Sequence, residues 1–202
     1  MGKASNSYTR LDSFGLKAKR LGYRSRAALK LKEINSKDKI LKKGKRVLDL
    51  GCSPGGWSQV CIQEVGSEGL VVGVDLKEVS PLKGVKFLKK DISELSRSLI
   101  MGLGMNSSKF DLVLSDMAPN ISGIKERDES QMLDLIELVK KTCNEFLSVD
   151  GTLLVKVFHG EAHENIMNYV KSNFQKVRIR KPSASRPSSS ELYVLAIGKK
   201  NE

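Results

Sequence analysis

Three acidic residues lie at or near the ends of successive short apolar segments. Asp49 lies in the apolar segment that leads into a glycine-rich turn, Asp75 ends the next apolar segment, and Asp91 follows the third. An acid at the end of a strand can accept both hydroxyls of a ribose, and one after the third strand could receive an adenine amino group. Each acid taken alone is more often a surface charge or a helix cap. Together, at the ends of successive segments, they favour a site for an adenosine.

The glycine-rich turn at 51–56 indicates what that adenosine carries. Glycines allow the backbone to approach a ligand closely. A phosphate-binding loop requires Lys and then Ser or Thr after its last glycine, but Trp57 follows Gly56. A dinucleotide fingerprint requires a glycine at its third position, where Ser53 stands. Because Asp49 would also repel a phosphate, the turn favours an adenosine with a positive sulfonium, which describes S-adenosylmethionine.

The later apolar segments carry residues suited to methyl transfer onto an oxygen. Asp116 ends the fourth segment and is followed by Met-Ala-Pro-Asn. Enzymes that methylate base amines usually carry Asn/Asp-Pro-Pro-aromatic there, so the missing aromatic argues for an oxygen acceptor. Lys156 lies within the apolar run 153–158, where an ammonium is costly unless it is paired. The alternative is a lysine that snorkels from a strand end. Glu191 begins the last apolar segment and is unremarkable alone.

The elements that hold these residues alternate short apolar runs with longer amphipathic segments. This alternation predicts an α/β fold with a mostly parallel sheet, whose carboxyl edge would gather the residues above. The last two strands are joined by a connection too short for a helical crossover, so we expect them to pair antiparallel. The predicted strands are 46–50, 70–74, 85–88, 110–115, 152–158, 176–180 and 192–197, and the clearest predicted helices are 25–34, 57–65 and 130–147.

The chain is long enough for one core, and its excess positive charge is concentrated at one end. It has 202 residues, of which 40% are hydrophobic. Residues 1–46 contain 15 Lys or Arg and 3 Asp or Glu, whereas the rest contains 20 of each. Such an asymmetry is typical of a surface that binds a polyanion, most simply a nucleic acid, and the alternative is a solvated basic tail. We expect a basic segment over 1–22 and a single domain over 23–202.

Other features argue against several classes of protein. The three cysteines, an odd number without C-x-x-C spacing, support neither a disulfide framework nor a zinc knuckle. The pair His159 and His163 departs from the zinc-helix pattern, because Gly160 follows the first histidine. No apolar run approaches the ~20 residues of a membrane span. Residues 1–20 lack the apolar core of a secretory signal, although their composition also fits an organellar transit peptide. We expect a cytoplasmic monomer without a metal and without membrane contact.

Five ordered motifs carry a resemblance to a known family. They are the segments 23–27, 49–57, 115–120, 155–158 and 185–191. With these motifs, the chain from 23 to 199 resembles the RrmJ/FtsJ family of ribosomal RNA large-subunit methyltransferases. The resemblance implies a Rossmann-like fold with the sheet order 3-2-1-4-5-7-6. It also implies methyl transfer from S-adenosylmethionine to the ribose 2′-hydroxyl of a uridine in large-subunit ribosomal RNA, on the assembled subunit.

The resemblance also implies the residues of the active site. A catalytic tetrad falls on Lys30, Asp116, Lys156 and Glu191. Lys32 is an alternative to Lys30, and only one of the two can join the site because they point to different faces of a helix. Lys156 would act as the base or would hold and polarise the hydroxyl, and Asp116 would orient it. The other two would position the ribose. The cofactor-binding residues are then Asp49, Gly51, Pro54, Gly55, Gly56, Trp57, Asp75, Asp91, Ile92 and Asp116.

The RNA phosphates would be bound by two groups of basic residues. These are Lys17, Lys19, Arg20, Arg24 and Arg26, and Lys176, Arg178, Arg180, Lys181 and Arg186. Other functions stay open: the same reaction on a tRNA anticodon loop or an mRNA cap, and a catalytically inactive ribosome-assembly factor. A nicotinamide oxidoreductase is disfavoured by the glycine pattern.

Overall fold

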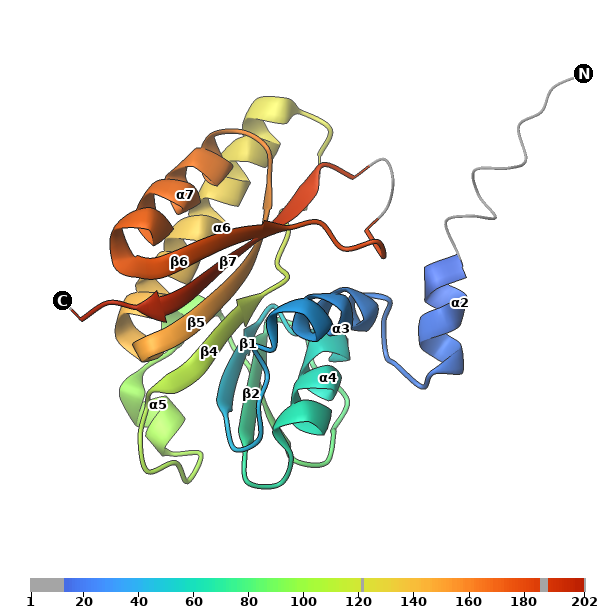
Figure 1. The fold of residues 1–202 in the computed structure, drawn as a ribbon, viewed down its shortest axis with the longest axis vertical. Helices are drawn as coiled ribbons and strands as arrows, with labels where there is room; N and C mark the ends of the chain where they lie inside the picture. The colour runs from blue at the N-terminus through green and yellow to red at the C-terminus, as the bar shows by residue number, and fades with distance from the viewer. Residues whose placement is uncertain (1–12, 121, 186–188, 202) are drawn as a thin grey trace, which may run out of the picture.

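The computed structural model describes residues 13–120, 122–185 and 189–201, and a seven-stranded sheet forms its centre. The strands are β1 (Arg46–Leu50), β2 (Leu70–Asp75), β3 (Val85–Lys89), β4 (Phe110–Ser115), β5 (Leu147–Phe158), β6 (Phe174–Arg180) and β7 (Glu191–Lys199). Their order is β3-β2-β1-β4-β5-β7-β6 (Figure 1). This observation confirms the sheet order that the family resemblance implies.

Within the described sheet, β7 runs against both of its neighbours. β1 pairs parallel with β2 and β4, β2 with β3, and β4 with β5. β7 pairs antiparallel with β5 and with β6, which confirms the predicted antiparallel pairing of the last two strands. Because β1 to β5 are parallel, their carboxyl ends share one edge of the sheet, which is where ligands bind in open α/β folds.

Helices cover both faces of the sheet (Figure 1). They are α2 (Ser13–Arg20), α3 (Ala27–Asp38), α4 (Gly56–Val65), α5 (Arg97–Met101), α6 (Lys125–Phe146) and α7 (Glu161–Asn173), with a 3-10 turn η1 at Ile92–Glu94. The predicted helices at 25–34, 57–65 and 130–147 correspond to α3, α4 and α6. α3 runs further than predicted and ends at Asp38. The next residue, Lys39, has a left-handed φ of 52°, and its N–H donates to the carbonyl of Asn35.

Side-chain alternation along the strands produces a core on each face of the sheet. On β1, Leu48 and Leu50 pack in the core that contains residues of α6 and α7, whereas Val47 packs in the core of α3 and α4. The second core also contains Trp57 and Tyr193, whose ring centroids are 5.8 Å apart. Helix α3 is therefore held over the face of the sheet on which Tyr193 lies.

Helix α2 lies apart from the sheet, on the outer side of α3 (Figure 1). Within it, Ala18 is buried, while Lys17, Lys19 and Arg20 are exposed. This helix forms part of the predicted basic segment 1–22, of which residues 1–12 lie outside the described residues. The helix therefore presents positive charge away from the cores.

Candidate active site

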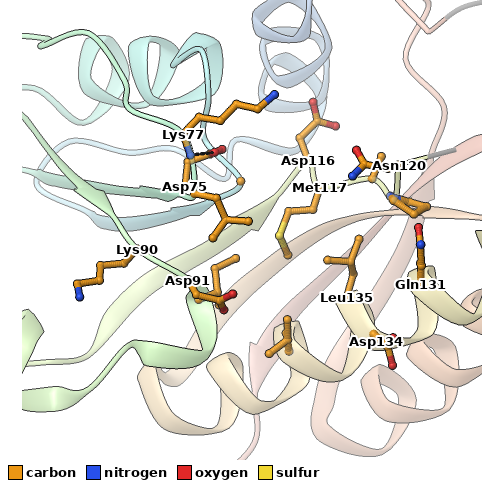
Figure 2. Close-up of a pocket in the computed structure, with 16 residues that line it drawn as sticks. Asp75, Lys77, Lys90, Asp91, Asp116, Met117, Asn120, Gln131, Asp134 and Leu135 are labelled. Atoms are coloured by element: carbon orange, nitrogen blue, oxygen red, sulfur yellow. Dashed lines mark hydrogen bonds between the residues drawn. The ribbon is translucent and has the colours of Figure 1, made fainter.

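A cavity of about 520 Å³ opens at the carboxyl ends of the parallel strands. Figure 2 shows side chains that end β2 and follow β3 on one side of the cavity, and side chains of α6 on the other. Small-molecule sites typically have volumes of about 300–1,000 Å³. Five of the ten predicted cofactor-binding residues line the cavity: Gly51, Asp75, Asp91, Ile92 and Asp116. The cavity therefore lies at the place that the sequence predicts for the cofactor.

The two acids expected to bind adenosine both have a second role in the backbone structure. Asp75 accepts hydrogen bonds from the N–H of Ser53 at 2.9 Å and the N–H of Lys77 at 2.8 Å, so it joins the turn after β1 to the end of β2. Asp91 accepts from the N–H and hydroxyl of Ser93, and these bonds lower the pKa of its carboxyl. Asp91 is thus the cap of η1 as well as a residue of the cavity wall. Ionised carboxylate oxygens have lone pairs left for a ligand.

The glycines of the turn after β1 allow close packing against two different parts of the protein. Gly51 lines the cavity with a φ of +69°, and a Cβ there would lie 2.3 Å from Cγ of Met117. A Cβ on Gly55 would instead lie 2.9 Å from the guanidinium of Arg24. At Gly56 the same addition would lie 2.2 Å from a hydroxyl near the start of α3. The later glycines therefore allow the turn and the segment before α3 to pack together.

Four predicted cofactor residues of this turn lie outside the lining of the cavity: Pro54, Gly55, Gly56 and Trp57. The Trp57 ring is buried, and its Nε1–H donates to the carbonyl of Ala27 at 2.8 Å. Its visible role is to fix α3 on α4. Direct contact between these four residues and a cofactor stays a prediction.

Asp49 lies in the interior beneath the turn and is 1% exposed. Its carboxylate accepts a hydrogen bond from the hydroxyl of Ser58 at 2.6 Å. The net effect of its surroundings raises the pKa of Asp49 to about 7: burial is the largest cause, the bond from Ser58 lowers the pKa, and the charges of Asp116 and Asp75 raise it. Three carboxyl groups near one cavity wall make this region favourable for a positively charged ligand.

The four predicted catalytic residues come together as two ion pairs. Lys30 Nζ lies 2.5 Å from Oε1 of Glu191, and Lys156 Nζ lies 3.1 Å from Oδ1 of Asp116. Lys156 also donates to the backbone carbonyl of Asp116. Lys30, Lys156 and Glu191 are buried, although each retains a small exposed fraction of 7–8%. Two lysines and two acids at the edge of an apolar core form an array that packing alone does not require.

Strand register explains why these residues meet. In the antiparallel pair of β5 and β7, Phe158 lies opposite Glu191 and Lys156 lies opposite Tyr193. Lys30 reaches the pair from α3, with its Nζ 5.7 Å from the centre of the Tyr193 ring. These contacts decide between the two lysines of the helix. Lys32 is exposed and donates to the hydroxyl of Tyr23, so Lys30 is the one that joins the array.

Tyr193 belongs to this array although sequence reasoning did not select it. Its hydroxyl donates to Oδ1 of Asp116 at 2.7 Å, the oxygen that also faces Lys156. Burial raises the pKa of Tyr193, and the nearby carboxylates of Asp116 and Glu191 raise it further, so the phenol stays a donor. The signal in the sequence was its place two residues after Glu191, on the same face of β7. The cavity residues of α6 were also missed, because an amphipathic helix pattern does not show which turn faces a ligand: Gln131, Asp134, Leu135 and Leu138.

Glu191 is ionised within this array. Burial raises the pKa of its carboxyl, but the hydrogen bond from Lys30 and the positive charges of Lys30 and Lys156 outweigh that effect, and the net shift is downward. The positive charges of Lys30 and Lys156 therefore both compensate the negative charge of this carboxylate. Its hydrogen bond with Lys30 gives it a visible role in holding that ammonium within the array.

Several of the predicted RNA-binding arginines are already bonded within the protein. Arg24 donates to the carbonyls of Pro54, Ser80 and Pro81, at 3.3, 2.7 and 2.7 Å. Arg26 donates to the carbonyl of Ala184. Arg178 and Arg180 each form an ion pair with Asp38, which joins α3 to β6. The predicted cations that remain exposed are Lys17, Lys19, Arg20, Lys176 and Lys181, and Arg186 lies outside the described residues.

Neither a metal site nor a membrane-spanning helix is found among the described residues. No group of three or more His, Cys, Asp or Glu side chains there is arranged to hold a metal ion. None of the described helices is both long and apolar enough to cross a membrane.

Comparison with known proteins places the chain among curated relatives of similar length. The model of the FtsJ-like methyltransferase family matches residues 23–199. A protein of Methylobacillus flagellatus named ribosomal RNA large subunit methyltransferase E is 43% identical over 190 residues, which cover 94% of this chain and 92% of that protein. A protein of Hydrogenovibrio crunogenus with the same name is 44% identical over 191 residues, with the same coverage of 94% and 92%.

Solved structures share the fold. A crystal structure described as a ribosomal RNA methyltransferase from Plasmodium falciparum has a TM-score of 0.78 and 30% identity, and covers 89% of this chain and 100% of its own. A chain of a fibrillarin/Nop5p complex has a TM-score of 0.58 and 17% identity, with coverage of 82% and 78%, and at that identity it shows the fold alone. Taken with the family model that matches residues 23–199, these relatives show that the chain belongs to the FtsJ-like methyltransferase family.

Proposed function

We propose that this protein transfers the methyl group of S-adenosylmethionine to the ribose 2′-hydroxyl of a uridine in large-subunit ribosomal RNA, with the assembled subunit as its substrate. We place this activity in the cytoplasm, with the protein acting as a monomer. The observation that carries the proposal is the buried array of Lys30, Glu191, Lys156 and Asp116 beside a cavity of about 520 Å³. The names of the relatives from Methylobacillus flagellatus and Hydrogenovibrio crunogenus support the choice of RNA.

The cavity fits an adenosyl cofactor with a positive charge. Asp75 ends β2 at the place where an acid accepts ribose hydroxyls, and Asp91 with Ile92 would hold the adenine. Asp116 would face the sulfonium, and the positive charge of the cofactor would favour the ionised form of Asp49 beneath the turn. When bound, the cofactor supplies an activated methyl group, so the residues of the protein need only align the acceptor oxygen and manage its proton.

Lys156 is the residue that we assign to the acceptor hydroxyl. Its nitrogen has three positions besides its bond to carbon, and Asp116 takes two of them through the backbone carbonyl and Oδ1. One position is left for the substrate. With a neutral amine that position is a lone pair that accepts the proton, and with an ammonium it is an N–H that holds the oxygen. The hydroxyl of Tyr193 fixes Asp116 and so fixes the direction of the free position.

Lys30 and Glu191 would position the ribose. Lys30 uses one of its three donors on Glu191 and has two left for substrate oxygens. Glu191 in turn lies near both lysines and keeps its negative charge. In this arrangement each side chain of the array has a defined partner before RNA arrives, which is the preorganisation that alignment of a nucleophile requires.

The proposal is tested by methyl transfer from radiolabelled S-adenosylmethionine to large ribosomal subunits from cells that lack the protein. Naked ribosomal RNA and tRNA serve as parallel substrates, and the labelled position is mapped to base or ribose. Label on the ribose of a large-subunit uridine supports the proposal. Label on tRNA would identify tRNA as the substrate instead. Cofactor binding without label on any RNA would favour a catalytically inactive assembly factor.

The matched variants are Lys156→Ala and Lys32→Ala. The first removes the group assigned to the hydroxyl, and the second removes an exposed lysine of α3 that bonds to Tyr23. We expect Lys156→Ala to abolish transfer while cofactor binding persists, and Lys32→Ala to retain turnover. Near-full turnover of Lys156→Ala with normal binding would contradict the assignment.

A further inference from the structure

A second cavity, of about 340 Å³, lies next to the proposed active site. It shares Pro119 with the first cavity, and it continues between the start of α6, the end of β5 and the start of α7. The residues that the argument uses are Lys125, Asp128, Glu129, Met132, Phe158 and His159. Neither the cofactor assignment nor the four-residue array accounts for this space.

The chain connects this cavity directly to the array. Phe158 lies opposite Glu191 in the pairing of β5 and β7 and is two residues after Lys156, which is about 7 Å along a strand. Ser190 of the cavity immediately precedes Glu191, and Pro119 comes three residues after Asp116. A group that is covalently attached to a ribose at Lys156 is therefore within reach of the cavity.

The walls of the cavity suit a planar ring. Phe158, Met132 and Pro119 supply apolar surface, and the exposed imidazole of His159 adds a second aromatic face. Proteins that bind unpaired bases stack them on such side chains and bond to their polar edges. Lys125 can supply hydrogen-bond donors to a carbonyl of a base, and the imidazole can donate or accept.

The charges of the cavity argue against a phosphate. Asp128 accepts from the N–H and hydroxyl of Ser122 and the N–H of Gly123, and the bonds from Ser122 lower the pKa of its carboxyl. Glu129 accepts from the N–H of Glu161 at 2.6 Å. Two carboxylates in one wall repel an anion but tolerate a neutral base. The negative charge of its wall therefore distinguishes this cavity from the exposed lysines, whose positive charge suits the phosphates of the RNA backbone.

We infer that this second cavity binds the base of the nucleotide whose ribose is methylated, with Phe158 and His159 as the stacking surfaces. The inference rests on the proposed function and extends it, since it assigns residues that choose the acceptor nucleotide. His159, whose spacing in the sequence argues against a zinc site, becomes a specificity residue on this assignment.

The test compares two large-subunit substrates whose ribosomal RNA differs only in that base. The first carries the mapped target nucleotide intact, and the second carries an abasic residue at that position with its 2′-hydroxyl retained. Single-turnover methyl transfer is measured for the wild type, for His159→Ala, and for Glu164→Ala, an exposed residue of α7 outside the cavity. His159→Ala alters an exposed side chain, and thermal unfolding of each variant checks the fold.

With the wild type, the abasic RNA should react about 5- to 140-fold more slowly, the range that loss of one base-stacking interaction gives. His159→Ala should slow the reaction of the intact RNA but add little to the effect of the abasic residue, because both changes remove the same contact. Glu164→Ala should match the wild type on both substrates. Equal slowing of both RNAs by His159→Ala, or no effect of the abasic residue, would overturn the inference while leaving the proposed function standing. Absence of transfer to any RNA would instead overturn the proposed function and the inference with it.

Discussion

Replacing the Lys30–Glu191 pair one partner at a time, and then both together, tests whether the array is retained for function. The variants are Lys30→Met, Glu191→Leu and the double variant. Glu191→Leu leaves the ammonium of Lys30 without its observed partner in a site where it is 8% exposed. Lys30→Met leaves the carboxylate of Glu191, which still experiences the positive charge of Lys156. The structure therefore predicts unequal effects for the two single variants.

The expected magnitudes follow from the burial of the pair. Leaving a buried charge uncompensated costs about 3–5 kcal/mol, so Glu191→Leu should lower the free energy of unfolding by that amount. Lys30→Met should cost less, on the order of 1–3 kcal/mol. The double variant should lie within about 1 kcal/mol of the wild type or above it, because apolar residues of similar volume often replace a buried pair without loss. At about 2–4 °C per kcal/mol for a chain of this size, Glu191→Leu should melt roughly 6–20 °C lower.

Urea denaturation followed by the fluorescence of Trp57 measures these values, since this is the one tryptophan of the chain and it lies in the core next to Tyr193. Lys32→Met is the matched control on the exposed face of α3 and should change the free energy of unfolding by about 0.5 kcal/mol or less. All three pair variants should lose methyl transfer. The reasoning is refuted if the double variant is as unstable as the two single variants added together, because the two losses would then be independent and neither would come from a charge left without its partner.

Three other predictions concern the cofactor site and the basic surface. Between pH 4 and pH 7 the wild type should lose up to about 4 kcal/mol of unfolding free energy that Asp49→Asn does not lose. The reason is that the raised pKa of about 7, against an ordinary value of 3.8, keeps a proton on the folded form that the unfolded form has released; parallel pH profiles in urea titrations would contradict it. Gly51→Ala should destabilise the protein by more than about 1 kcal/mol, since alanine is strained at a φ of +69° and its Cβ would contact Met117. It should also weaken binding of S-adenosylmethionine in calorimetry, and an unchanged Kd would exclude Gly51 from the site. The triple alanine variant of the exposed α2 cations should reduce the slope of log RNA affinity against log salt concentration by about 2–3, measured by filter binding. Arg178→Ala removes an ion pair with Asp38, so it should lower stability and leave that slope unchanged. The residues of the triple variant are Lys17, Lys19 and Arg20.

The sequence by itself determined the strands and the edge of the sheet at which the site forms. Apolar runs that alternate with amphipathic segments place Asp75 at the end of β2 and Asp116 after β4, and parallel strands bring such ends together. The short connection before β7 likewise required an antiparallel pairing. These features depend on side-chain period and chain length, which are local properties.

The tertiary structure alone decided which side chains share the site. Only the packing of α3 against α4 and β7 shows that Lys30 meets Glu191 while Lys32 lies in solvent. The same packing turns Gly55 and Gly56 toward Arg24 and the segment before α3, away from the cavity lining. The hydrogen bond of Tyr193 to Asp116 likewise joins residues 77 positions apart. Contacts of this kind depend on how distant elements pack, and spacing along the chain carries little information about them, because a rotation of one helix exchanges the residues that face the sheet.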